Sequence, residues 1–285
     1  MKSDDRFGLR PLWDSLLEIY KAFEVVCLKH GLRCYATDGT ALGAIRHKGF
    51  IPWDDDFDVS MPRPDYEKFR AFAASELPPH LRFIDCRNTS SFTMLFGKIQ
   101  DSRKNHVAEV EAKIGHSLPG GIGIDIFPIE GCPATLLKRN AIRLANFLLT
   151  RAMVFRNMKL DTSSPRGMAY FLFGKFAKVL APRLKTDADY IRALERLSLA
   201  TDFESNSFTC RTCSQRNLFR RVPLPKSVWG KPMAVEFEET TILVPEDCDA
   251  YLRNEFDKHD YKELPPPEQQ HPTHASGGNF SWRFG

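Results

Sequence analysis

The chain has 285 residues, of which 42% are hydrophobic and 27% charged, and its formal net charge is +4. This is enough apolar material for the core of one large domain or two small ones. No run of about 18 apolar residues occurs, which excludes a helix that spans a membrane.

The first residues, Met1 to Arg6, are polar and lead into no apolar segment, so we expect no signal peptide and a cytoplasmic protein. The seven cysteines form no dense framework, which indicates free thiols in a reducing compartment. Cys210 and Cys213 form one C-x-x-C pair. A zinc site would need further ligands recruited by folding, for which the candidates are Cys132, His271 and His274.

Apolar spacing, alternation and proline positions predict the elements in chain order. We expect a helix through Trp13 and Cys27 that stops at Gly31, a strand over 32–37, a helix over 41–47, a strand over 56–61, a helix from Pro64 to Pro78, strands over 81–86, 93–99 and 124–127, helices over 135–159, 168–180 and 187–199, strands over 207–210, 233–237 and 241–244, and a helix over 246–256. The proline-rich tail over 261–267 is expected to lack regular structure.

The turn Thr37-Asp38-Gly39-Thr40 precedes the short helix over 41–47. Gly39 allows a backbone to approach a phosphate closely, and the amides at the start of a helix favour an anion. Arg46 and Lys48 add positive charge. This segment therefore predicts a phosphate-binding turn.

The segment from Asp56 to Met61 alternates polar and apolar residues. In a strand, alternation sends Asp56 and Asp58 to one face and the apolar side chains to the other. Paired carboxylates repel each other unless a cation lies between them, and oxygen ligands suit Mg²⁺ or Mn²⁺. The alternative is a solvated acidic turn. Together with a phosphate-binding turn, the pair indicates metal-assisted phosphoryl or nucleotidyl transfer.

Two later residues are candidates for the same site. Asp125 stands between isoleucines in a short strand, where a carboxylate is costly unless it faces positive charge, so we expect it to be a third metal ligand. The alternative is an edge-strand aspartate facing water. Lys98 near the end of the strand over 93–99 is a candidate phosphate contact or an ordinary surface lysine.

The run DGTALGAIRHKGFIPWDDDFDVSMPRPDYEKF, residues 38–69, resembles the signature of the LicD/fukutin family, and so do residues 96–101, 123–128 and 261–274. The resemblance implies a phosphotransferase of the α+β class, with a nucleotidyltransferase-like mixed sheet flanked by helices and a largely helical C-terminal part. We expect a catalytic core over 1–130, and a region over 131–285 that packs on it and binds the acceptor or a membrane surface.

The family resemblance also implies a reaction. The donor is expected to be CDP-choline, with CDP-ribitol as the alternative, the acceptor a hydroxyl of a cell-surface glycan or glycolipid, and the released product CMP. The expected roles are metal ligands (Asp56, Asp58 and Asp125), phosphate contacts (Arg46 and Lys98), a proton acceptor (Asp38 or Asp125) and a donor pocket (Gly39, Thr40 and Trp53). Nucleotidyl transfer would use the same site and remains open.

Positive charge is concentrated between Thr135 and Lys185. This stretch holds eleven Lys and Arg and one acid, Asp161, a net +10 that leaves −6 for the rest of a chain of +4. Such a segment indicates an anionic partner. We expect peripheral binding at the inner face of an anionic membrane, through Lys175, Lys178, Arg183 and Lys185; alternatively, these four residues line the active-site cleft.

A nucleic-acid-binding module is the alternative from another functional class. The basic segment lacks the exposed aromatic platforms and glycine-rich loops of single-strand binders, so we expect no nucleic-acid partner.

Overall fold

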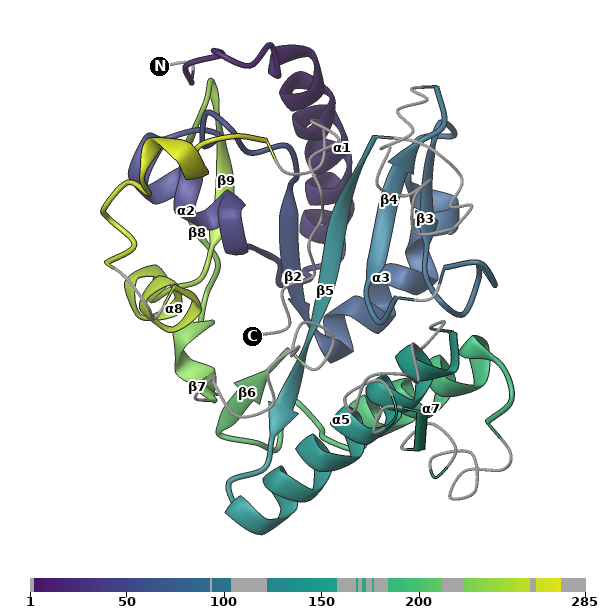
Figure 1. Cartoon of the computed structure of the whole chain (residues 1–285). Helices are drawn as coiled ribbons and strands as arrows, with labels where there is room; N and C mark the ends of the chain where they lie inside the picture. Colours follow the sequence, from purple (N-terminus) through teal and green to yellow (C-terminus); the bar gives the residue numbers. More distant parts are fainter. Residues whose placement is uncertain are drawn as a thin grey trace.

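The computed structural model describes residues 3–92, 94–103, 122–157, 168, 171–172, 176, 184–211, 223–256 and 260–272 (Figure 1). Its elements are α1 (Arg10–Lys29), β1 (Tyr35–Ala36), α2 (Asp38–His47), β2 (Asp58–Pro62), α3 (Arg63–Glu76), β3 (Leu81–Ile84), β4 (Gly97–Asp101), β5 (Gly123–Cys132), α5 (Leu136–Asn157), α7 (Asp187–Leu199), β6 (Phe208–Cys210), β7 (Leu224–Pro225), η2 (Lys226–Val228), β8 (Met233–Phe237), β9 (Thr240–Val244), α8 (Cys248–Glu255) and η3 (Pro267–Gln269). This mixture of helices and a mixed sheet confirms the predicted α+β class.

The main sheet has the strand order β1-β2-β5-β4-β3, and β6 and β7 continue it from the far half of β5. β2 and β5 are parallel neighbours, whereas β1–β2, β5–β4, β4–β3, β5–β6 and β6–β7 are antiparallel. A parallel pair needs a long crossover connection, and here α3, β3 and β4 lie between β2 and β5 in the chain. The central strands β2 and β5 therefore bring distant parts of the sequence side by side.

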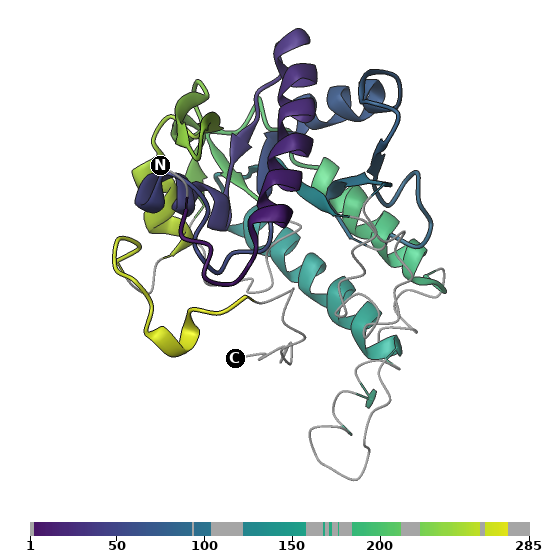
Figure 2. The same cartoon turned by 90° about the horizontal axis from the view of Figure 1, so that it is seen from above.

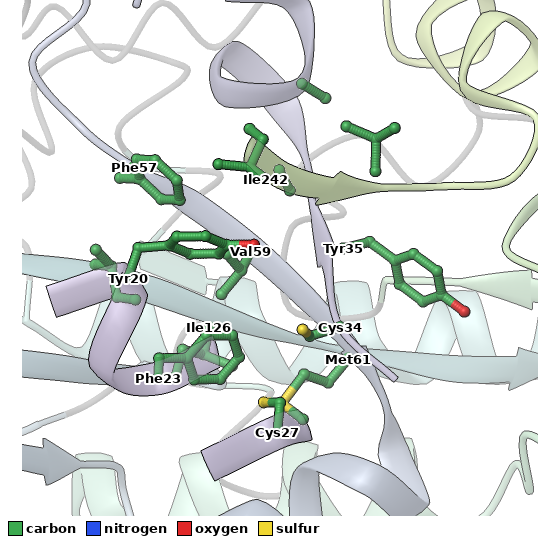
Figure 3. Packing of buried hydrophobic residues seen from close by; sticks show 14 of the residues in the cluster. Tyr20, Phe23, Cys27, Cys34, Tyr35, Phe57, Val59, Met61, Ile126 and Ile242 are labelled. Carbon is green, nitrogen blue, oxygen red and sulfur yellow. The ribbon is translucent and has the colours of Figure 1, made fainter. Parts of the chain in front are cut away.

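One face of the sheet is packed against α1 and α3, which also contact each other. Fully buried apolar residues alternate along the central strands on this face, among them Val59 and Met61 of β2 and Ile126 of β5. Figure 3 shows Tyr20, Phe23 and Cys27 of α1 packed over these strands. We call this the core face and the opposite one the site face. Since side chains alternate along a strand, the residues between the buried ones point to the site face.

The C-terminal part adds both strands and helices. Figure 1 shows the hairpin β8–β9 and helix α8 gathered beside α2, while α5 and α7 lie at the end of the sheet where β5 meets β6. Trp229, Phe237 and Tyr251 belong to the same hydrophobic cluster as α1 and β2. The hairpin β8–β9 and helix α8 therefore pack on the N-terminal core. The division into regions 1–130 and 131–285 stays a prediction.

Most predicted elements occur within a few residues of their expected bounds. The first strand is shorter than expected, Tyr35–Ala36 instead of 32–37, and two other strands differ in their bounds. β4 begins at Gly97 rather than 93, and β5 extends beyond 127 to Cys132, because its second half pairs with β6. Among the described residues, no helix has both the length and the hydropathy needed to cross a membrane. The predicted roles of Cys213, His274, Lys175, Lys178 and Arg183 fall outside the described residues.

Candidate functional site

Three predicted site residues form a row across the site face. Asp58 of β2 is the register partner of Asp125 of β5, and Asp125 is the register partner of Lys98 of β4. The Lys98 Nζ lies 3.2 Å from the Asp125 Oδ1, and both side chains are partly exposed. Because each residue follows or precedes a buried isoleucine or valine, alternation sets all three on the same face.

The start of α2 borders this row. The Thr40 hydroxyl is buried and accepts a hydrogen bond of 2.9 Å from the Asp58 amide, so it fixes the first residue of β2. A Cβ atom at Gly39 would lie 2.5 Å from Asp54 Oδ2, so any other residue at this position would force the Asp54 carboxylate to move. Thr40 and Gly39 thus both hold α2 against the aspartate segment; their predicted roles in substrate binding stay predictions.

The aspartate segment concentrates negative charge. Burial, and then the Asp56 carboxylate, raise the pKa of Asp54 well above its usual value. Burial also raises the pKa of Asp58, with Asp56, Asp38 and Asp125 as the neighbouring charges. A bound cation would relieve this repulsion. The predicted metal-ligand roles of Asp56 and Asp58 stay predictions, and Asp54 is an additional acidic neighbour of Asp56.

Asp38 is held by a buried arginine that the sequence did not single out. Arg211, directly after β6, contacts both carboxylate oxygens of Asp38, one of them at 2.7 Å, and Glu255 of α8 at 3.1 Å. Its guanidinium also lies over the Phe127 ring on the site face. The Asp38 amide donates to the Tyr251 hydroxyl at 3.0 Å.

The backbone of Asp38 is in the left-handed region, with φ of 49°. A residue other than glycine adopts this conformation at a cost, which surrounding contacts must offset. The contacts from Arg211 and Tyr251 supply that support. Their effect is to fix the Asp38 carboxylate at the beginning of α2.

Arg46 and Trp53 lie at the other end of α2. Arg46 Nη1 donates to the backbone carbonyls of Tyr261 and Glu263, both at 3.0 Å, and so ties the tail to α2. Burial lowers the pKa of Arg46, whereas the Asp54 charge acts in the opposite direction. Trp53 is half-buried between the Arg6 guanidinium, 5.3 Å from a ring centroid, and the edge of His47. The predicted phosphate contact of Arg46 and donor contact of Trp53 stay predictions.

One contact in the structure indicates that a predicted ligand suits a divalent cation. Asp125 Oδ1 is buried and accepts no hydrogen bond from the described residues, and Lys98 is the cation beside it. A hard oxygen ligand of this kind fits Mg²⁺ or Mn²⁺. The described residues also contain a tighter cluster, Glu18, His80 and Asp101, whose ligand atoms lie within 4.8 Å of one another. Arg103 already joins Glu18 and Asp101 there, which makes this cluster an ion-pair network.

The predicted cysteine pair is only half described. Cys210 lies beside Cys132 across β5 and β6, and both are free thiols. The hydrogen bond from Cys210, with Arg139 and Arg143 nearby, lowers the pKa of Cys132 to about 7 although burial opposes it. His271 is exposed. A zinc site at these residues stays a prediction.

Comparison with known proteins finds one matching family model and one relative that matches over most of the chain. Residues 31–132 match the sequence model described as LicD/FKTN/FKRP, nucleotidyltransferase domain. The chain is 26% identical over 267 residues to the lipopolysaccharide cholinephosphotransferase LicD of Haemophilus influenzae, covering 90% of this chain and 92% of that protein. Shorter matches are to uncharacterized proteins of Rickettsia typhi (36% identical, 20% of this chain and 18% of that protein) and Rickettsia prowazekii (37%, 18% and 19%).

Proposed function

We propose that the chain is a phosphotransferase of the LicD/fukutin family that moves phosphocholine from CDP-choline to a hydroxyl of a cell-surface glycan or glycolipid, releasing CMP. The likeness to a cholinephosphotransferase over nearly its whole length supports the reaction class. The row of Asp58, Asp125 and Lys98 on neighbouring strands is the observation that carries the proposal at the level of residues.

In this proposal Asp56, Asp58 and Asp125 hold Mg²⁺ or Mn²⁺. The cation would offset the charge of the donor diphosphate and favour ionisation of the attacking hydroxyl. The buried Asp125 Oδ1, which accepts no hydrogen bond from the described residues, and the mutual repulsion around Asp58 support this assignment.

Positive side chains orient the donor in the same proposal. Lys98 can turn from Asp125 to a phosphate oxygen, since its flexible stem carries a compact charge. Arg46 would add charge to the phosphates from the end of α2. Trp53, Gly39 and Thr40 shape the surface on which the donor rests, the last two by fixing α2 against the aspartates.

Two carboxylates can accept the proton of the acceptor hydroxyl. Asp38 is fixed by Arg211, which orients it and stabilises its charged form. Asp125 is fixed by its strand and lies beside Lys98. Both alternatives from the sequence stay open. Asp38→Asn tests the first, because Asp38 is not one of the proposed cation ligands and its replacement should leave cation binding intact.

CDP-ribitol transfer and nucleotidyl transfer are the alternatives that use the same site. We further propose that residues 1–130 form the catalytic core, that residues 131–285 contribute to acceptor binding, and that the protein works at the inner face of the cell membrane. A lipid-linked acceptor would place the reaction there.

The test is a screen of CDP-choline, CDP-ribitol and nucleoside triphosphates with Mg²⁺ and lipopolysaccharide, following CMP, pyrophosphate and label in the acceptor. The expected result is CMP release with choline in the glycan, lost in Asp58→Asn. Pyrophosphate release would instead establish nucleotidyl transfer. The absence of CMP from every CDP-linked donor, with a folded protein and several glycan acceptors, would refute the proposed function.

A further inference from the structure

Helix α5 presents large apolar side chains to solvent. Leu136, Leu137, Leu144 and Leu148 are 64%, 85%, 50% and 38% exposed. The last three lie at helical spacing with the exposed Ala141, so they form one stripe along the helix. Near its C-terminal end, α5 packs on α7, where Ala152 and Tyr190 are buried together and Leu149 and Met153 pack against them. The exposed leucines lie outside this contact.

The same helix is strongly basic. Over Leu136–Asn157 it contains five Lys and Arg and no acidic residue. Lys138 is exposed, and Arg151 is half-exposed with its guanidinium over the Phe147 ring. We define the α5 outer face by Leu137, Leu144, Leu148, Lys138 and Arg151. Figure 2 shows α5 running away from the sheet.

A second stretch of the basic segment repeats the pattern. Met168, Phe171, Leu172 and Phe176 are helical and all exposed. Their spacing again gathers apolar side chains on one side of a helix. Exposed apolar residues thus coincide with the part of the chain that carries a net +10.

We propose that the α5 outer face binds the surface of an anionic lipid bilayer. Leucines next to Lys and Arg on one helix suit the boundary between acyl chains and acidic headgroups. Two copies of the chain paired through the α5 outer face would bring its positive charges, Lys138 and Arg151, against those of the other copy. A nucleic acid would satisfy the charges and leave the leucines in water. A bilayer alone complements both features.

The inference deepens the proposed function, because a lipid-linked acceptor is presented at such a surface. Its physical basis is independent of catalysis. The experiment therefore measures binding to vesicles that contain neither donor nor acceptor.

The full chain is sedimented with vesicles of phosphatidylglycerol and phosphatidylethanolamine, with phosphatidylcholine vesicles in parallel. We expect binding to the acidic vesicles, release by raised salt, and at least about a tenfold loss of affinity in Leu137→Gln/Leu144→Gln/Leu148→Gln, since each leucine buries apolar area in the bilayer. Lys138→Gln/Arg151→Gln should weaken acidic binding and reduce its salt dependence. The matched control is Val25→Gln/Leu28→Gln, which removes apolar side chains of similar exposure from α1.

Binding of the triple leucine variant equal to that of the original chain would overturn the proposal. So would a concentration-dependent dimer that the triple variant abolishes, because the face would then join two copies. Vesicle binding without any transferase activity would leave this inference standing and refute only the proposed function.

Discussion

Replacement of the buried Arg211 should destabilise the protein more than replacement of a nearby exposed arginine. The Arg211 side chain is 6% exposed, and its partners Asp38 and Glu255 are 22% and 9% exposed. At an effective dielectric constant of about 20, unit charges about 4 Å apart attract by roughly 4 kcal/mol, which the cost of desolvation largely offsets. Loss of one partner alone leaves the remaining charges buried and unpaired, and such changes typically cost about 3–5 kcal/mol.

We therefore expect Arg211→Gln to lower the free energy of unfolding by about 3–5 kcal/mol in urea titration, with an unchanged dependence on urea concentration. Arg253→Gln is the matched control on α8. Its pair with Asp249 is 58% and 51% exposed, so this change should cost far less stability than Arg211→Gln. Arg211→Lys should fall between the two, because it keeps the charge and loses the bidentate geometry. A loss below about 1 kcal/mol in Arg211→Gln would refute the role assigned to this residue.

Three further predictions concern the aspartates and their support. Asp58→Asn should abolish transfer while the fold persists. Because burial raises the folded-state pKa of Asp58, the original chain loses stability as pH rises from about 3.8 to that pKa, so the variant should gain stability relative to it over this range. Equal pH profiles of the two proteins in urea titrations would contradict this. Chelation with EDTA should end transfer, and Mg²⁺ or Mn²⁺ should restore it better than Zn²⁺, since the proposed ligands are all oxygens; full activity after exhaustive chelation would exclude the metal-assisted route. Thr40→Val should cost about 1–3 kcal/mol by leaving the Asp58 amide without its acceptor, whereas Thr40→Ser should stay close to the original chain, and unfolding curves that show the two variants to be equal would argue against this hydrogen bond.

Local pattern was enough to predict the aspartate strand. The alternation from Asp56 to Met61 predicted which side chains are buried, because a strand has a fixed period of two, and Phe57, Val59 and Met61 are indeed fully buried. That Lys98 and Asp125 belong to the site was expected from the family resemblance and from the residue types. Their register with Asp58 is known only from the structure, since the sequence of a strand does not determine which strand it pairs with.

Arg211 could not be predicted in the same way. It lies 173 residues from Asp38, and its surroundings in the sequence carry no pattern that distinguishes it from a surface arginine. Its burial results from where β6 joins the far half of β5. The strand β5 itself was predicted too short for this reason, because the residues beyond 127 take their strand partner from β6.

The parallel pairing of β2 and β5 determines when Asp58 and Asp125 come together during folding. Asp58 and Asp125 are 67 residues apart in the sequence and become neighbours only when the intervening loop closes. Closure of a long loop costs chain entropy before its contacts form, and topologies dominated by such distant pairings fold slowly. Helices such as α1 can form from nearby residues on a much shorter timescale. During refolding, helical structure should therefore precede the meeting of the two carboxylates, and a growing chain can bring them together only after β5 has left the ribosome.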